Sequence, residues 1–176
     1  MAGITAIANG TFESCSQLVN IALPDGLETI GHRSFNNCSS LKTVIMPDTV
    51  TSIGEYSFQN CGELTTLHIS SAITEIPRQA FYYCRKVKEL VLPPNLKVVQ
   101  QYGFCDFRAM TKLTLPTTLT TIGEASFYRW EKVENLTIPA SVESIGVQAF
   151  RYWYAVKTIT FEGTPTTIGS NAFQTT

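Results

Sequence analysis

Cysteine is the residue type whose spacing in this sequence could support chemistry. Four of the five cysteines, Cys15, Cys38, Cys61 and Cys84, follow one another at intervals of 23 residues, and Cys105 falls out of phase. Thiolates act as nucleophiles and metal ligands, and paired thiols form disulfides. An odd count with one cysteine per interval argues against a disulfide framework. We therefore expect buried free thiols that pack as small hydrophobic side chains.

Other signals for catalysis are weak. The two histidines, His32 and His68, take different positions within the 23-residue interval. The sequence has no glycine-rich phosphate loop, no His-Glu-x-x-His segment and no Cys-x-x-Cys pair. Cysteines stacked in a line cannot form a tetrahedral metal site, and an apolar column differs from the electropositive surroundings of a reactive thiol. We therefore predict that the protein is not an enzyme, and we expect no metal or cofactor.

The composition argues against several classes of partner. The 176 residues have the length of one ordinary domain, 44% of them are hydrophobic, and the net charge is −1 with no run of Lys or Arg. A nucleic-acid partner or a membrane surface is therefore not expected. No stretch of about 18 apolar residues exists, so we expect no membrane insertion. Residues 1–4 lack the pattern of a signal peptide, so we expect either an intracellular protein or a segment of a longer exported chain.

Repetition organises the whole chain. Apolar residues also recur six, nine, eleven, fifteen and eighteen positions after a phenylalanine that itself recurs every 23 residues. One repeat cannot bury its apolar face alone, so columns kept over seven repeats predict a stack of coils. We call the recurring residues the ladder phenylalanines: Phe12, Phe35, Phe58, Phe81, Phe104, Phe127, Phe150 and Phe173.

The spacing within one repeat predicts its local structure. The alternation in residues 67–69 is typical of a short strand, and the proline that follows in most repeats ends the pairing because it has no N–H. A second extended piece, residues 50–53, ends at a glycine that we expect to need a positive φ. Pro77 and Gln100 replace this glycine, so the turns should differ there. A small residue, the phenylalanine, a cysteine and a leucine at spacings of one, three and three predict a short helical turn.

Stacking of equivalent residues about 4.8 Å apart would form ladders of Phe, Leu and Ile. We therefore predict one solenoid domain over residues 1–176. It should be a right-handed coil of about seven 23-residue repeats, with a parallel β-sheet about 35 Å long on one face and short helical turns on the other. Neither end shows a polar cap, which indicates a segment of a longer array or an engineered one.

The repeat is similar to that of a known family. In the third repeat it reads Leu41-x-x-Val44-x-Met46-Pro47-x-x-Val50-x-x-Ile53-Gly54-x-x-Ser57-Phe58-x-x-Cys61-x-x-Leu64. This pattern resembles the BspA-like, or Treponema-type, leucine-rich repeats, and it covers nearly all of residues 4–173. The resemblance implies a leucine-rich repeat solenoid that binds proteins or mediates adhesion, in a secreted or cell-surface protein of bacteria or some protists. It implies no catalytic residues.

Tyrosine, tryptophan and arginine are concentrated in the second half. Residues 1–77 contain one Tyr, one Arg and no Trp, whereas residues 78–154 contain six Tyr, five Arg and both Trp. Most of the excess lies just after the ladder phenylalanines, and these residue types are enriched at protein interfaces. We therefore predict a contact ridge for a protein partner of unknown identity, formed by Tyr82, Tyr83, Arg85, Phe107, Arg108, Tyr128, Arg129, Trp130, Arg151, Tyr152, Trp153 and Tyr154.

Several interpretations stay open at this stage. Phe107, Trp130 and Trp153 could instead replace the buried cysteine inside the core, although overpacking costs about 1–3 kcal/mol, so that the later coils would be wider or these rings would lie partly outside. The ridge resembles a selected paratope, natural or laboratory-made, and the ridge or the uncapped ends could also join copies of the chain. The outward side of the strands is a second candidate surface. The alternative function is a structural spacer or scaffold segment of a larger cell-surface protein.

Overall fold

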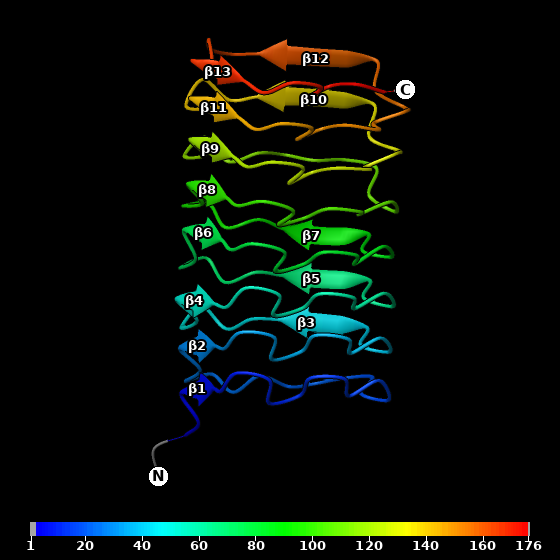
Figure 1. Cartoon of the computed structure of the whole chain (residues 1–176). Coiled ribbons are helices and arrows are strands. Elements are labelled where there is room, and N and C mark those ends of the chain that lie inside the picture. Colours follow the sequence, from blue (N-terminus) through cyan, green and yellow to red (C-terminus); the bar gives the residue numbers. More distant parts are fainter. Residues whose placement is uncertain (1–2, 176) are drawn as a thin grey trace.

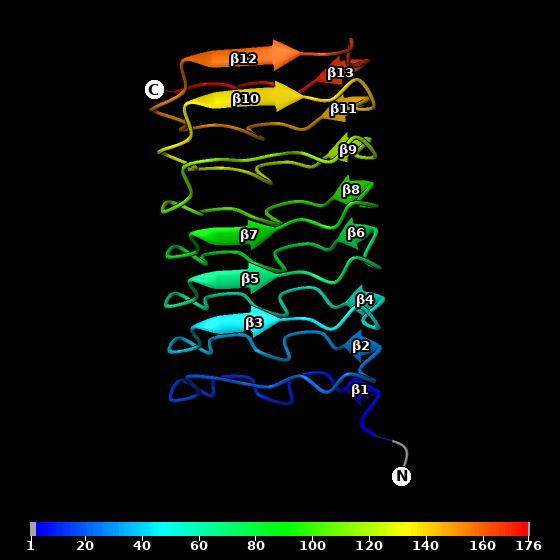
Figure 2. The same ribbon diagram turned by 180° about the vertical axis from the view of Figure 1, so that it is seen from behind.

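The chain forms a solenoid of stacked coils. The structure is a computed structural model that describes residues 3–175, and within them it contains thirteen short strands and no helix. Each coil places its strands at two edges of the stack, so that the strands form two columns (Figure 1). Figure 2 shows the same two columns from behind, with the chain termini at opposite ends of the stack.

The two columns differ in strand length. The short-strand column consists of β1 (Ala6–Ile7), β2 (Thr29–Ile30), β4 (Ser52–Ile53), β6 (Glu75–Ile76), β8 (Val98–Val99), β9 (Thr121–Ile122), β11 (Ser144–Ile145) and β13 (Thr167–Ile168). The long-strand column consists of β3 (Thr43–Ile45), β5 (Thr66–His68), β7 (Glu89–Val91), β10 (Asn135–Ile138) and β12 (Thr158–Phe161). All pairings are parallel, and each residue pairs with its equivalent in the next coil, as Leu67 does with Leu90. The parallel solenoid of 23-residue coils is thus confirmed.

The strands do not form the single continuous sheet that we predicted, because both columns are interrupted. The short-strand column divides between β4 and β6. In the preceding coil the Gly54 N–H donates to the Ile30 carbonyl oxygen at 2.8 Å. Pro77 takes the position of that donor and has no N–H, so β6 cannot repeat this bond to β4. The long-strand column is interrupted at residues 111–115, which form no strand.

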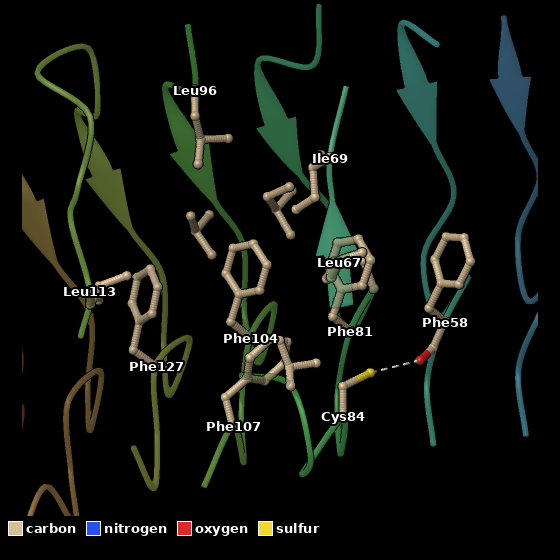
Figure 3. Packing of buried hydrophobic residues seen from close by; sticks show 14 of the residues in the cluster. Phe58, Leu67, Ile69, Phe81, Cys84, Leu96, Phe104, Phe107, Leu113 and Phe127 are labelled. Carbon is tan, nitrogen blue, oxygen red and sulfur yellow. Dashed lines mark hydrogen bonds between the residues drawn. The ribbon is translucent and has the colours of Figure 1, made fainter. Parts of the chain in front are cut away.

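Phenylalanine rings form the centre of the core. The six inner ladder phenylalanines, Phe35 to Phe150, are all fully buried, whereas the terminal Phe12 and Phe173 are partly buried. Successive rings stack nearly parallel, with centroid distances from 4.9 Å for Phe35–Phe58 to 5.7 Å for Phe104–Phe127. Figure 3 shows this row of rings side by side. The predicted phenylalanine ladder is confirmed, with a spacing slightly wider than that of strands.

The predicted short helical turns are wrong. Around Phe35, successive N–H groups alternate between acceptors in the next coil and acceptors in their own coil. Phe35 N–H donates to the Ser57 carbonyl oxygen of the next coil at 2.7 Å, whereas Asn36 N–H donates to the Arg33 carbonyl oxygen of its own coil at 3.1 Å. A helix needs every N–H to bond within its own segment. Because half of these donors are used between coils, the segment forms successive tight turns.

Two left-handed residues in each coil prevent a helix from forming. They lie two positions before and two positions after the ladder phenylalanine, as Tyr56 and Asn60 do around Phe58, with φ of 58° and 60°. Asparagine tolerates this conformation better than most residues. In the first three coils the second of these positions carries a small polar residue, and in three of the next four it carries Tyr or Arg: Ser14, Asn37, Asn60, Tyr83, Asp106, Arg129 and Tyr152.

The glycines that follow the short strands are required for a reason other than the expected positive φ. Among the described residues only Gly10 is a glycine with positive φ, so Gly31, Gly54, Gly123, Gly146 and Gly169 do not have one. A Cβ at Gly123 would instead lie 2.6 Å from the Val99 carbonyl oxygen of the preceding coil. Glycine is therefore needed because adjacent coils approach closely at this position.

Candidate protein-binding surface

The regular cysteines are buried inside the solenoid, apart from Cys15, and donate hydrogen bonds between coils. Cys84 Sγ–H donates to the Phe58 carbonyl oxygen of the preceding coil at 3.3 Å (Figure 3), and Cys38 and Cys61 make the same bond. Burial, together with the neighbouring Cys15, raises the pKa of Cys38 from 9.0 to about 11. Burial also raises the pKa of Cys61. These thiols stay protonated at neutral pH, which makes them poor nucleophiles and poor metal ligands.

Neither a metal site nor a membrane-spanning helix is found among the described residues. Among residues 3–175, no three His, Cys, Asp or Glu side chains come together in a way that could hold a metal ion. Within the same residues, no helix has the length and apolar character needed to cross a bilayer.

Three of the residues assigned to the ridge belong to the core. The side chains of Phe107, Trp130 and Trp153 are 0%, 0% and 1% exposed. Each ring meets the ladder phenylalanine of its own coil edge to face, as Trp153 does Phe150 at a centroid distance of 5.2 Å. They cannot reach a partner docked on the surface, so the prediction is corrected for these three residues. The alternative, larger core residues in place of cysteine, is the one that the structure supports.

The tryptophans preserve the hydrogen bond of the cysteines that they replace. Trp130 Nε1–H donates to the Phe104 carbonyl oxygen at 2.8 Å, and Trp153 Nε1–H donates to that of Phe127 at 2.6 Å. Phe107 occupies the same position without a donor. Cys and Trp can both donate this hydrogen bond because each carries a hydrogen on a polar atom. The volumes of the two side chains do not predict this shared ability.

The other nine predicted ridge residues lie at the surface. Arg85 and Tyr154 are exposed and the rest are half-buried. They follow the ladder phenylalanines and lie in the loops that lead into the long-strand column. From this point the ridge means these nine residues: Tyr82, Tyr83, Arg85, Arg108, Tyr128, Arg129, Arg151, Tyr152 and Tyr154.

Aromatic and cationic side chains contact each other at both ends of the ridge. At the N-terminal end the rings of Tyr82 and Tyr83 lie 4.3 Å apart, and the Arg85 guanidinium lies 4.2 Å from the Tyr83 ring centroid. At the C-terminal end the guanidinium of Arg151 lies 4.6 Å from the Tyr152 ring. Tyr152 also meets Tyr128 at 5.1 Å and stacks on Tyr154 at 5.7 Å. Such contacts favour a fixed arrangement of the exposed side chains.

A buried carboxylate that sequence reasoning missed joins the two ends. Asp106 is 1% exposed, and its oxygens accept hydrogen bonds from Arg85 Nε at 3.0 Å and Arg108 Nε at 2.6 Å. This bonding raises the pKa of Arg108. Glu131 Oε1 lies 3.6 Å from Arg129 Nε and continues the network. The sequence does distinguish this residue. Among the left-handed residues that lie two positions after a ladder phenylalanine, Asp106 is the one that is acidic.

The outward side of the long-strand column is a second open surface. Ile45 and Val91 are 56% and 49% exposed, which is high for aliphatic side chains on a sheet. Between them His68 Nε2 lies 2.8 Å from Glu89 Oε1 of the next coil. The remaining outward residues are mainly threonines, in agreement with a solvated sheet face.

Comparisons with known proteins show where this solenoid belongs. A profile described as the BspA type leucine rich repeat region, in six copies, matches residues 5–128 and 74–176. A leucine-rich repeat protein from Bacteroides ovatus superposes with a TM-score of 0.76 at 26% identity, covering 81% of this chain and 39% of that one. A T. pallidum leucine rich repeat protein gives a TM-score of 0.59 at 20% identity, covering 94% and 66%.

A leucine rich cell surface protein from Faecalibacterium prausnitzii has a TM-score of 0.55 at 19% identity, with 93% of this chain and 59% of that one covered. None of the curated proteins matches the chain. The chain spans 39% of the B. ovatus protein and 66% of the T. pallidum protein. Because the profile covers nearly the whole chain and the 23-residue coil is the observed unit, the chain belongs to the family of BspA-type leucine-rich repeat proteins.

Proposed function

We propose that the chain is a non-enzymatic protein-binding module whose ridge contacts the partner. One observation carries the proposal: the Tyr and Arg side chains of the ridge already pack against one another. Arg151 lies on the neighbouring Tyr152 ring at 4.6 Å, and Tyr152 meets Tyr128 of the preceding coil at 5.1 Å. A surface arranged before binding loses less conformational entropy on association than a flexible one. Tyrosine and arginine are also the residue types that most often provide binding energy at interfaces.

The buried carboxylate supports the same proposal. Asp106 holds Arg85 and Arg108 from below, and both guanidinium groups still reach the surface, with side chains 46% and 33% exposed. A guanidinium fixed on one edge can present its other N–H groups to carbonyl or carboxylate groups of a partner. The network therefore favours a polar, well-oriented contact between the two aromatic ends of the ridge.

A non-catalytic role fits the chemistry of the core. Burial raises the pKa of the Cys38, Cys61 and Cys84 thiols, so these thiols stay protonated at neutral pH, and the two histidines lie at different positions of the coil. We further propose a secreted or cell-surface location with a role in adhesion. Support comes from the family and from the F. prausnitzii relative, which is described as a cell surface protein.

The test replaces ridge residues by the residue that the same position carries in earlier coils. The triple variant Tyr83→Asn, Arg129→Asn and Tyr152→Asn keeps a left-handed conformation that Asn37 and Asn60 already adopt. We expect this variant to lose binding to animal cells, measured by flow cytometry with the labelled chain, and to lose any self-association seen by sedimentation velocity. Its melting temperature should stay near that of the wild type.

The control variant carries three substitutions on the other surface, Thr43→Asn, Thr66→Asn and Thr158→Asn. It should bind as the wild type does. Equal binding by the ridge variant and the wild type would exclude the ridge as the contact surface. A wild-type chain that neither binds cells nor self-associates would favour the alternative function, a structural spacer.

A further inference from the structure

One coil of the stack has no strand in the long-strand column. Residues 111–115 stay extended, with Leu113 and Leu115 buried and Lys112 and Thr114 outward, in the same order as the strands around them. Yet no backbone hydrogen bond joins these five residues to any other part of residues 3–175. In Figure 1 this segment is the plain tube between β7 and β10.

The separation is confined to one edge of the coil. The short-strand column continues through the same coil, where Ile122 of β9 pairs with Val99 on one side and with Ile145 on the other. On the long-strand edge, a groove of about 660 Å³ lies between β7 and Leu113. A second groove of about 750 Å³ lies between Leu113 and β10. The backbone N–H and C=O groups of residues 111–115 thus have no backbone hydrogen-bond partner within the described residues and lie beside these two grooves.

A change of side-chain size in the core coincides with these grooves. The third residue after the ladder phenylalanine changes from Cys84 to Phe107 and then to Trp130, and the long-strand pairing is missing at both steps. From Trp130 to Trp153 the size is constant, and there β10 and β12 pair over four residues. Coils with unequal fillings cannot keep the strand spacing of about 4.8 Å at every edge.

Three lysines and three glutamates line the grooves, and the two kinds of charge differ in how they are paired. Lys88, Lys112 and Lys132 line them and form no ion pair within the described part of the chain. Two of the acidic residues there are engaged, because Glu89 lies 2.8 Å from His68 and Glu134 lies 2.9 Å from Lys157. Glu162, at the far rim, is the remaining carboxylate. Among the described residues the unpaired charges at the grooves are therefore three lysines and one glutamate, an excess that favours an anionic occupant.

We propose that the grooves at residues 111–115 bind an extended acidic segment of a partner protein. An extended polypeptide offers alternating N–H and C=O groups, which match the free donors and acceptors of this coil. Nucleic acid phosphates offer acceptors alone and would leave the free carbonyl groups without partners. Carboxylates of the segment pair with Lys88, Lys112 and Lys132. This site is separate from the ridge and does not depend on it.

Fluorescence anisotropy with a labelled peptide of four Glu-Val units tests the charge complementarity, and a peptide of four Lys-Val units serves as the negative probe. We expect the Lys88→Glu and Lys112→Glu variants to weaken binding of the acidic peptide by about tenfold each. Lys42 occupies the position of Lys88 two coils earlier, far from the grooves, so Lys42→Glu is the matched control and should change binding by about twofold or less. Circular dichroism confirms that each variant is folded.

Amide hydrogen exchange tests the backbone pairing. Saturation with the acidic peptide should slow exchange at residues 111–115 by about tenfold or more and leave the already paired residues 66–68 unchanged. The ridge variant should bind the peptide as the wild type does. Equal binding by the lysine variants and the Lys42→Glu control, unchanged exchange at residues 111–115, or equally strong binding of single-stranded thymidine oligonucleotide at the same lysines would each overturn the proposal.

Discussion

At the scale of single residues, one position shows what a pattern of apolar residues conceals. The third residue after each of the six inner ladder phenylalanines is buried, as its spacing predicted, and in every one of these coils except that of Phe107 it also donates a hydrogen bond to the preceding coil. Burial can be predicted from periodicity because an amphipathic repeat must hide one face. The hydrogen bond could not be predicted in this way, because the carbonyl group that accepts it belongs to another coil and comes near only when the coils stack.

Burial of the thiols should make the free energy of unfolding fall at alkaline pH. The folded state raises the pKa of Cys38 from 9.0 to about 11, so the folded chain keeps a proton that the unfolded chain releases in this range. The contribution to stability is present below pH 9 and is lost as the pH rises toward 11. Urea denaturation at pH 8, 9 and 10 should show the unfolding free energy falling above pH 9.

The Cys38→Ala variant supplies the control for this pH dependence. It has no thiol at this position, so its unfolding free energy should fall less between pH 9 and pH 10 than that of the wild type. An identical fall in both proteins would show that the dependence comes from other groups.

At the scale of the elements, strands could be predicted more securely than turns. Alternation in residues 67–69 and the constant 23-residue spacing set both the strand β5 and its register. The segment around each ladder phenylalanine was wrongly predicted to be helical. Its apolar spacings of one, three and three are compatible with a helix and also with successive tight turns. The residues that settle it, such as Tyr102 and Arg129 with φ of 58° and 62°, are types that seldom adopt left-handed conformations.

The close approach of coils at the glycine column gives a matched pair of variants. Gly123→Ala places a Cβ 2.6 Å from the Val99 carbonyl oxygen, whereas Gly62→Ala meets no atom within 4 Å. We expect Gly123→Ala to lower the unfolding free energy by about 1–3 kcal/mol through overpacking against rigid backbone. Chemical denaturation measures both variants, and Gly62→Ala should be nearly neutral. Equal effects would contradict close approach as the reason for glycine.

The missing strand in the long-strand column should be visible in the free protein. Leu67 and Leu113 are equivalent and both buried, at 0% and 8% exposed, but only Leu67 lies in a hydrogen-bonded strand. Amides of residues 111–115 should therefore exchange with solvent much faster than those of residues 66–68, as measured by nuclear magnetic resonance. Comparable protection would mean that this coil pairs with its neighbours in solution.

At the scale of the whole molecule, the sequence predicts the stack but not its irregularities. Seven equal intervals between Phe12 and Phe173 leave one simple arrangement, coil upon coil, and the structure has it. The gaps beside residues 111–115 depend on how unequal fillings such as Cys84 and Phe107 alter the distance between coils, and no single column shows that. Likewise, composition predicts the ridge, but only packing decides that Trp130 lies in the core and not in the ridge.

Position along the stack should decide what a ladder phenylalanine contributes. Phe104 is fully buried between Phe81 and Phe127, whereas Phe12 is partly exposed and stacks on Phe35 from one side. We expect Phe104→Ala to cost about 3–5 kcal/mol of unfolding free energy. Phe12→Ala should cost clearly less in the same urea titrations. Similar losses for both would argue against stacking from two sides as the source of stability.

The alternating donors of the turns have a consequence for how such a chain can change over time. Phe35 N–H reaches the next coil and Asn36 N–H does not, so one inserted or deleted residue would exchange these roles in every turn that follows within that coil. Tolerated length changes should therefore come as whole 23-residue units, by duplication or loss of complete coils. Relatives of different length are then expected to differ by multiples of one coil.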